Sequence, residues 1–324
     1  MTEWDAEKAK DTIASGGRFG AKCVMEEVYR NNIGVFHRWG YTLPNGKFVG
    51  LGDRNAFLNG TKVYARAFDV NDVPGWGGET KTGCINADCV DVAESLIAAG
   101  FNPAILNLAS RRKPGGGYDR GMSAQEETLC RLSTLSQSLY QYFDATRKCV
   151  QDAGVSHKFN AYPLDINFGG IYSADVVFFR HNLKAGYAFR EIPFSCGVIT
   201  VAALSFREPN AYCNEERQYM ASDGGFTPAG DAIQLNKIRT ICRLALKNGH
   251  DSVVLGAFGC GVNKLPCDGV ADQFRRVFDD PEFKGKFRAL VFAILEGRGN
   301  VRHPVEENGR FAPFYKVFGK WQKG

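Results

Sequence analysis

The sequence has no apolar run long enough to cross a membrane, which needs about 20 residues. Its longest apolar runs, Gly197–Phe206 and Ala289–Leu295, are far shorter and predict buried strands. The N-terminal residues are charged and lack the apolar core of a secretory signal. These absences predict a cytoplasmic protein that does not bind a membrane.

The sequence also lacks the spacings that hold metals. Its 10 cysteines include no CxxC pair, and its 5 histidines do not lie at zinc-ligand spacings. We therefore expect reduced thiols, no metal and no cofactor. The net charge of +5 is mild and no basic stripe is present, which argues against a nucleic-acid ligand but permits a phosphate-rich one.

Helices alternate with apolar strands along most of the chain, which predicts an α/β fold around a largely buried sheet. Residues 1–60 contain two predicted helices and a hairpin that turns at Pro44-Asn45-Gly46, and we interpret them as an N-terminal extension packed on the core. Residues 61–324 would form the main domain. The pattern predicts a strand over Thr61–Phe68 and a long helix over Ser123–Phe143.

One glycine-rich turn, Gly115-Gly116-Gly117, lies between a predicted strand and the helix that begins near Ser123. Ser123 and Glu126 have the spacing of a capping box. Free backbone N–H groups at such a helix start favour an anion. The alternative is a plain glycine connector followed by solvated glutamates that suit the helix dipole.

A second glycine-rich turn contains Gly256, Gly259 and Gly261, again after an apolar strand and before a helix. Its GxxGxG spacing is neither a P-loop nor the dinucleotide fingerprint. The sheet thus contains two units that each consist of a strand, a glycine-rich loop and a helix. This predicts a diphosphate bound between the two loops, at the carboxyl ends of the strands.

The segment GGGYDRGMSAQEE resembles the GGG-x(6–8)-QEE signature of the poly(ADP-ribose) glycohydrolases. The segments NLASRRKPGGG and VLGAFGCGV are similar to the microbial-type branch of that family, and the resemblance extends from about Thr61 to Glu296. It implies a three-layer α/β/α macrodomain with a mixed central sheet. It also implies an ADP-ribose ligand and hydrolysis of the O-glycosidic ribose–ribose bonds of poly(ADP-ribose).

The same resemblance implies the roles of the two glutamates. Glu127 would be the general acid that protonates the leaving oxygen and the base that then activates water. Glu126, the other catalytic-site carboxylate, would position a ribose hydroxyl. A helix N-terminus lowers the pKa of a carboxyl, whereas a general acid needs a raised pKa. We expect the bound ligand, by excluding water, and the charge of Glu126 to raise the pKa of Glu127.

The remaining site residues also follow from the resemblance. Asn107 would bond the terminal ribose, Gln125 would orient it, and Tyr172 would pack on adenine. The backbone that lines the diphosphate would be Gly115, Gly116, Gly117, Gly259, Cys260, Gly261 and Val262. Asn263 stands where many family members carry an aromatic, so we expect weaker positioning of the ribose. From pattern alone, Asn107 could be a turn former, Tyr172 a core aromatic and Cys260 a small loop residue.

Other functions stay open on the sequence alone. The chain could bind ADP-ribose without turnover, remove mono-ADP-ribose from protein, or release phosphate from an ADP-ribose phosphate. Only cleavage at the ribose requires the acid at Glu127. The expected partners are ADP-ribose, poly(ADP-ribose) or ADP-ribosylated protein.

Overall fold

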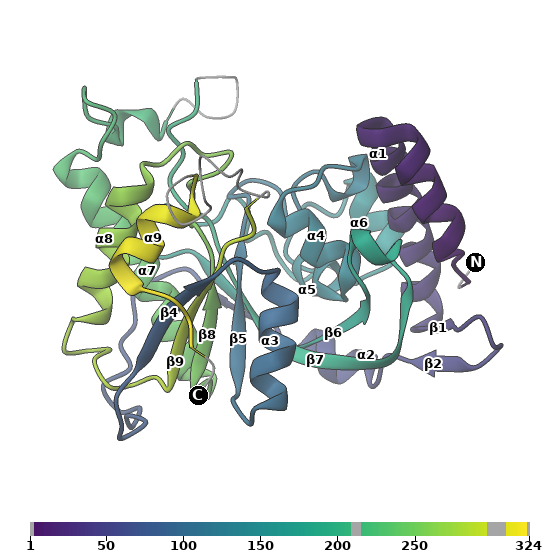
Figure 1. Ribbon diagram of the computed structural model, residues 1–324, viewed down its shortest axis with the longest axis horizontal. Helices are drawn as coiled ribbons and strands as arrows, with labels where there is room; N and C mark the ends of the chain where they lie inside the picture. The colour runs from purple at the N-terminus through teal and green to yellow at the C-terminus, as the bar shows by residue number, and fades with distance from the viewer. Residues whose placement is uncertain (1–2, 209–214, 297–308, 323–324) are drawn as a thin grey trace. The chain divides into compact units, whose positions relative to one another are not determined.

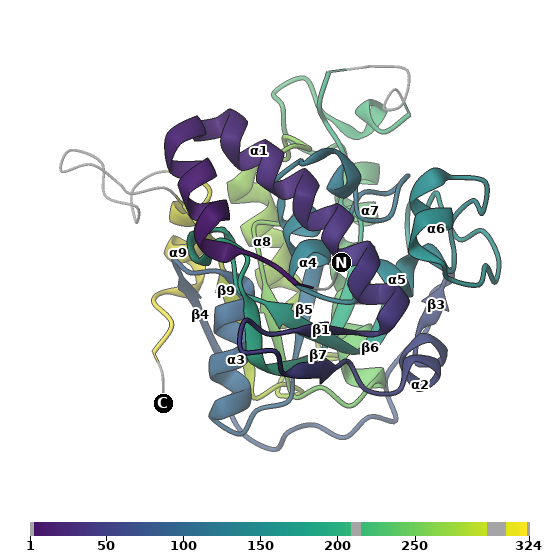
Figure 2. The same cartoon turned by 90° about the vertical axis from the view of Figure 1, so that its right-hand side faces the viewer.

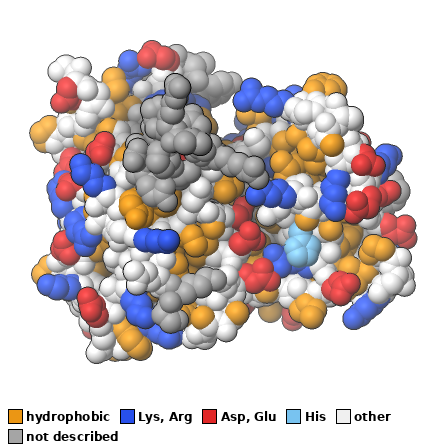
Figure 3. All heavy atoms as spheres, in the orientation of Figure 1, with side chains coloured by type: hydrophobic (Ala, Val, Ile, Leu, Met, Phe, Trp, Pro, Cys, Tyr) orange, Lys and Arg blue, Asp and Glu red, His pale blue; other side chains and the backbone are white. Residues whose placement is uncertain are grey.

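The computed structural model describes residues 3–208, 215–296 and 309–322. Within these ranges the chain has a mixed α/β fold with a seven-stranded sheet and flanking helices, which confirms the predicted class (Figure 1). None of the helices in the described ranges is both long and apolar enough to span a membrane. On the face drawn in Figure 3, basic and acidic side chains are interspersed, in keeping with the mild net charge.

The chain divides into two compact units. Unit 1 comprises Met1–Val63, Ala109–Pro163 and Ile171–Val198. Unit 2 comprises the other three segments, Tyr64–Leu108, Leu164–Gly170 and Ile199–Gly324. The first 60 residues thus share a unit with later segments, and their role as a separate extension stays a prediction.

Unit 1 begins with the helix α1 (Ala6–Arg38), which combines the two predicted helices across an interruption at Gly17 (φ 52°, ψ −131°). Asp5 caps its N-terminus by accepting a hydrogen bond from the backbone N–H of Lys8. The predicted hairpin follows as strands β1 (Gly40–Thr42) and β2 (Phe48–Gly50), paired antiparallel. Helix α1 contacts α4 and α6 of the same unit (Figure 2).

Strands β3, β6 and β7 lie next to one another in that order. The strand predicted over Thr61–Phe68 is shorter than expected, because only Lys62–Tyr64 pairs as β3. The remaining elements that lie wholly or largely in unit 1 are α2 (Arg54–Asn59), η1 (Tyr118–Arg120), α4 (Gln125–Leu132), α5 (Leu135–Tyr140), α6 (Lys148–Ala153), β6 (Gly170–Arg180), η2 (Leu183–Ala185) and β7 (Phe189–Val201).

The prediction of one helix over Ser123–Phe143 is wrong, since α4 and α5 are separated at Ser133 and Thr134. Ser133 has an extended backbone (φ −146°, ψ 179°). The N–H of Thr134 donates to the carbonyl of Val177 over 3.1 Å, and the N–H of Val177 donates to Thr134 Oγ1 over 3.1 Å. Bonds to β6 therefore replace helical bonds at this point.

In unit 2, four parallel strands run in the order β5 (Pro103–Leu108), β8 (Ser252–Leu255), β9 (Ala289–Ala293) and β4 (Lys81–Ile85). Strand β4 was not predicted from the sequence. This strand lies at the end of a glycine-rich stretch, and such a composition is typical of a loop. The helices are α3 (Cys89–Ala98), η3 (Arg217–Tyr219), α7 (Pro228–Lys247), α8 (Cys267–Phe278) and α9 (Phe311–Phe318). Helix α8 packs against both α7 and α9 (Figure 1).

Because β5 and β8 are adjacent and parallel, their carboxyl ends lie at the same edge of the sheet. A Cβ atom added at Gly256, just after β8, would be 3.3 Å from Leu108 Cδ1 at the end of β5. The end of β5 and the second glycine-rich turn are therefore neighbours in unit 2.

Candidate active site

The first glycine loop in unit 1 has a backbone that glycine adopts most readily. Gly115 has φ of +71° and Gly116 has φ of +52°. A Cβ atom at Gly116 would also come within 2.4 Å of Glu127 Oε1. The missing side chain at Gly116 thus lets a carboxylate approach the loop backbone closely.

Both glutamates of the motif turn their carboxylates into this loop. Glu126 accepts hydrogen bonds from the N–H groups of Ser110 (2.7 Å) and Gly115 (3.0 Å), one through each oxygen. Glu127 accepts a hydrogen bond from the N–H of Gly117 over 2.8 Å through Oε1. The side chains are buried, with exposed fractions of 3% for Glu126 and 8% for Glu127.

The two carboxylates differ in their remaining hydrogen-bonding capacity. Each oxygen of Glu126 takes a loop N–H, so this side chain joins the loop to the first turn of α4. Glu127 is anchored through Oε1, and within the described part of the chain no hydrogen bond to its Oε2 is seen. Glu127 is therefore the carboxylate with an oxygen left for proton transfer, and Glu126 is suited to fixing the loop.

The predicted capping box at Ser123 is wrong. Helix α4 begins at Gln125, and its N-cap is Ala124, with no side-chain hydrogen bond at the cap. The carboxylate of Glu126 would have closed the box, but it bonds Ser110 and Gly115 instead. The tertiary loop therefore competes successfully with the local capping pattern.

A buried polar cluster supports the loop from α1. Asn32, which has no exposed surface, donates from Nδ2 to the hydroxyl of Tyr118 (2.8 Å) and to the carbonyl of Arg131 (2.9 Å). Tyr118 follows the three glycines directly, and Tyr29 packs edge-on against its ring at 5.0 Å. Asn32 thus links α1 to the glycine loop and to α4. Sequence reasoning missed this residue, although a lone asparagine on the apolar face of a helix is a usable signal.

The side chains beneath Gly115 are uncharged. A Cβ atom at Gly115 would be 3.4 Å from Cys130 Sγ and 3.5 Å from the Tyr140 hydroxyl. Burial, followed by the charges of Glu126 and Glu127, raises the pKa of the Cys130 thiol well above its usual value. Cys130 is therefore a neutral packing residue beneath the carboxylates.

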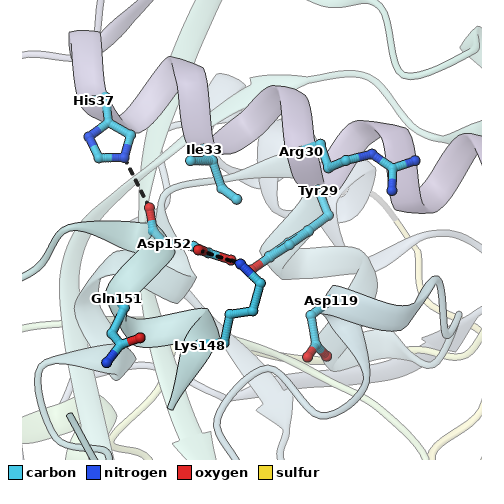
Figure 4. A pocket seen from close by; sticks show the side chains of 8 residues that line it. All are labelled: Tyr29, Arg30, Ile33, His37, Asp119, Lys148, Gln151 and Asp152. Carbon is cyan, nitrogen blue, oxygen red and sulfur yellow. Dashed lines mark hydrogen bonds and ion pairs between the residues drawn. The ribbon is translucent and has the colours of Figure 1, made fainter. Parts of the chain in front are cut away.

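A cavity of about 670 Å³ lies elsewhere in unit 1, between α1, η1 and α6 (Figure 4). Asp152 organises it: its carboxylate accepts hydrogen bonds from Lys148 (2.8 Å) and Tyr29 (3.4 Å), and its carbonyl oxygen contacts His37 Nε2 at 3.0 Å. Asp119 lies on the opposite side in Figure 4. Neither glutamate of the motif lines this cavity, so we do not place the reaction there.

The second glycine loop, in unit 2, is tightly packed. Gly259 has φ of +79°, and a Cβ atom there would lie 2.4 Å from Leu265 Cδ1 and 2.8 Å from the Cβ atom of Ala203. Val262, at the tip, is 60% exposed. The carbonyl of Asn263 accepts a hydrogen bond from the N–H of Phe206 over 2.8 Å. Glycine at 259 is therefore required by both conformation and space.

The other predicted site residues lie as follows. Asn107 is fully buried on β5 in unit 2 and donates from Nδ2 to Thr200 Oγ1 over 3.2 Å. Tyr172, on β6 in unit 1, is 6% exposed, and Lys62 Nζ lies 6.0 Å from the centre of its ring. Gln125 is the first residue of α4 and is half-buried. Their contacts with a ribose or an adenine stay predictions.

No group of three or more metal-ligating side chains is present in the described ranges. The site chemistry visible in unit 1 is that of two buried carboxylates on a glycine loop.

Comparison with known proteins agrees with this geometry. The family model "Microbial-type PARG, catalytic domain" matches residues 30–181. A poly(ADP-ribose) glycohydrolase structure from Thermomonospora curvata is 25% identical, covers 93% of this chain and 100% of its own, and superposes with a TM-score of 0.66. Over these residues the chain is similar to the microbial-type poly(ADP-ribose) glycohydrolases. The structural match also confirms the predicted macrodomain-like fold.

Two further glycohydrolase structures are similar to this chain. That of the T. curvata enzyme bound to the inhibitor ADP-HPD is 25% identical, covers 92% of this chain and 99% of its own, and has a TM-score of 0.64. That of the Deinococcus radiodurans enzyme in complex with ADP-ribose is 25% identical, covers 83% of this chain and 98% of its own, and has a TM-score of 0.59. A search among curated proteins gave no match.

Proposed function

We propose that this chain is a poly(ADP-ribose) glycohydrolase that cleaves O-glycosidic ribose–ribose bonds and releases ADP-ribose. The observation that carries the proposal is the state of Glu127. Its carboxylate is buried, one oxygen is fixed by the N–H of Gly117, and the other is not hydrogen-bonded within the described residues. The family-model match over residues 30–181 and the ADP-ribose and ADP-HPD complexes of the similar enzymes support the same ligand class.

In this mechanism Glu127 first acts as general acid. Its protonated carboxyl gives a proton to the leaving ribose oxygen while positive charge builds on the anomeric carbon. The resulting carboxylate then accepts a proton from the attacking water. The bond from Gly117 holds the carboxyl in one orientation throughout.

Glu126 has a positioning role in the proposed mechanism. Its two oxygens hold the N–H groups of Ser110 and Gly115, which fixes the loop against α4. This favours loop positioning over the direct contact with a ribose hydroxyl that the family resemblance implied. The second glycine loop, together with Asn107, Gln125 and Tyr172, is proposed to contact the ADP-ribose as the resemblance implies.

We also propose that the protein acts in the cytoplasm. Nine cysteines of the described residues are free thiols, which supports a reducing compartment.

The proposal is tested by product analysis. Wild-type protein is incubated with poly(ADP-ribose) and, separately, with mono-ADP-ribosylated protein, and the products are identified by mass spectrometry. Release of ADP-ribose from the polymer is expected. Release only from mono-modified protein would make the chain a mono-ADP-ribosyl hydrolase, and binding without any release would make it an ADP-ribose-binding protein.

A further inference from the structure

Met122 is an exposed apolar residue in the turn that joins the first glycine loop to α4 in unit 1. Its side chain is 54% exposed. The residue lies between the three glycines and the two glutamates of the motif, and neither the motif nor the predicted helix gave it a role. A large apolar side chain that is kept in water beside a reacting group is a candidate ligand contact, because ligand sites are lined mostly by apolar groups around a few polar ones.

The side chain of Met122 packs on the third glycine of the loop. A Cβ atom added at Gly117 would lie 2.4 Å from Met122 Cγ and 3.6 Å from Glu127 Oε1. The N–H of Gly117 donates to that same oxygen, and the carbonyl of Gly117 accepts a hydrogen bond from the N–H of Met122 over 3.2 Å. Gly117 therefore has no side chain where Met122 needs the space, and Met122 and the carboxyl group of Glu127 lie beside the same Cα atom.

The backbone at Met122 is held by two helices of unit 1. Its carbonyl accepts a hydrogen bond from the guanidinium of Arg131, a fully buried residue of α4, the helix that also carries Glu127. The preceding residue, Gly121, has φ of +65°, and a Cβ atom there would lie 2.8 Å from the carbonyl oxygen of Lys22 on α1. The turn is thus fixed against both helices, which keeps the Met122 side chain next to the glycine loop.

This placement suits contact with a sugar. The carboxyl group of Glu127 is 8% exposed and anchored at Gly117, so a ribose oxygen that takes its proton must approach the loop beside Met122. The carbon-bound hydrogens of a ribose ring form an apolar face that can cover an exposed apolar side chain. Methionine is unbranched and flexible, and it adapts well to an irregular surface of this kind.

We propose that Met122 is a specificity-determining residue whose side chain packs on the ribose rings at the bond that Glu127 cleaves. The inference rests on the proposed function and adds to it the side chain that recognises the apolar face of the sugar. Arg131 and Gly117 act through Met122, because the first holds its backbone and the second leaves room for its side chain.

The first test is steady-state hydrolysis of poly(ADP-ribose) by full-length variants. A contact made equally in the ground state and the transition state affects KM and leaves kcat unchanged. Since one methylene at a substrate site is worth about 10-fold or more, Met122→Ala should raise KM at least ~10-fold with kcat within about threefold of the wild type. Met122→Leu keeps the apolar volume and should keep KM within about threefold. Ile192→Ala is the matched control, because Ile192 is an apolar residue of unit 1 that is also exposed, and it should leave both constants unchanged.

The second test measures the contact without turnover. Glu127→Gln protein is treated with hydrogen peroxide in the presence and absence of poly(ADP-ribose), and oxidation of Met122 to the sulfoxide is followed by mass spectrometry. Trypsin cuts after Arg120 and Arg131, so Met122 is the only methionine in its peptide. A methionine peptide added to each sample reports any peroxide consumed by the polymer. The polymer should slow oxidation of Met122 by about threefold or more, because a covered thioether is shielded from the peroxide.

Two results would overturn the inference: a KM for Met122→Ala within about threefold of the wild type, or equal oxidation of Met122 with and without polymer. A fall in kcat at unchanged KM would give the first of these results, and it is what a residue that only supports Gly117 would produce. If the wild type released no ADP-ribose from the polymer, the proposed function would fail, whereas the oxidation test would still decide whether the polymer contacts Met122.

Discussion

Replacement of Gly116 by alanine tests how closely the loop and the carboxylate of Glu127 are matched. The new Cβ atom would lie 2.4 Å from Glu127 Oε1, and an ordinary contact needs about 3.5 Å. The carboxyl group must therefore retreat by roughly 1 Å, a displacement that can lower the rate ~100-fold. The positive φ of +52° adds a stability cost of about 1–2 kcal/mol for a residue with a side chain.

The assay is ADP-ribose release from saturating poly(ADP-ribose), together with urea denaturation. Gly46→Ala is the control, because Gly46 has φ of +84° and no atom within 4 Å of an added Cβ atom. Both variants should lose stability to the positive φ. Gly116→Ala should lose more, because its Cβ atom also displaces the buried carboxyl of Glu127, and only Gly116→Ala should lose kcat. The reasoning is refuted if Gly116→Ala retains a kcat within about threefold of the control.

Two further predictions concern stability. Asn32→Ala should lower the free energy of unfolding by about 3 kcal/mol, because it removes the hydrogen bonds to Tyr118 and Arg131. It also leaves Arg180 Nε, which is 2.7 Å from Asn32 Oδ1, without this acceptor. Urea denaturation measures the change, and a loss below about 1 kcal/mol would contradict the role of Asn32 in supporting the glycine loop. Burial raises the pKa of Asp231, but bonds from Arg276 and Gln273 outweigh it and hold the pKa below its usual 3.8. The stability that Asp231 contributes is therefore full above that value and is lost as pH falls through the lower folded-state pKa. Asp231→Asn should be destabilised relative to the wild type at about pH 7, and the difference should shrink as the pH falls below 3.8. Equal urea midpoints at about pH 7 would contradict this.

The parts of the fold that were predictable depend on local patterns. The hairpin at Asn45-Gly46 follows from turn chemistry and is present, and the helix predicted to begin near Ser123 is present from Gln125. The existence of both features depends on neighbouring residues in sequence, so the sequence alone indicates them.

The errors occur where a distant segment competes for hydrogen bonds. The capping box failed because Ser110 and Gly115 take the carboxylate of Glu126. The long helix failed because Thr134 bonds Val177, which lies 43 residues away in the chain. The support that Asn32 gives the glycine loop likewise spans 86 residues to Tyr118. Such pairings carry no periodic signal.

The central claim is that the carboxyl group of Glu127 transfers the proton in glycosidic cleavage. It is tested most directly by measuring kcat on poly(ADP-ribose) and Kd for ADP-ribose in Glu127→Gln, whose amide keeps an oxygen that can accept from the N–H of Gly117. We predict a fall in kcat of about 100-fold to 10,000-fold with Kd changed by less than about threefold. A Glu127→Gln protein that hydrolyses the polymer at the wild-type rate would contradict the account.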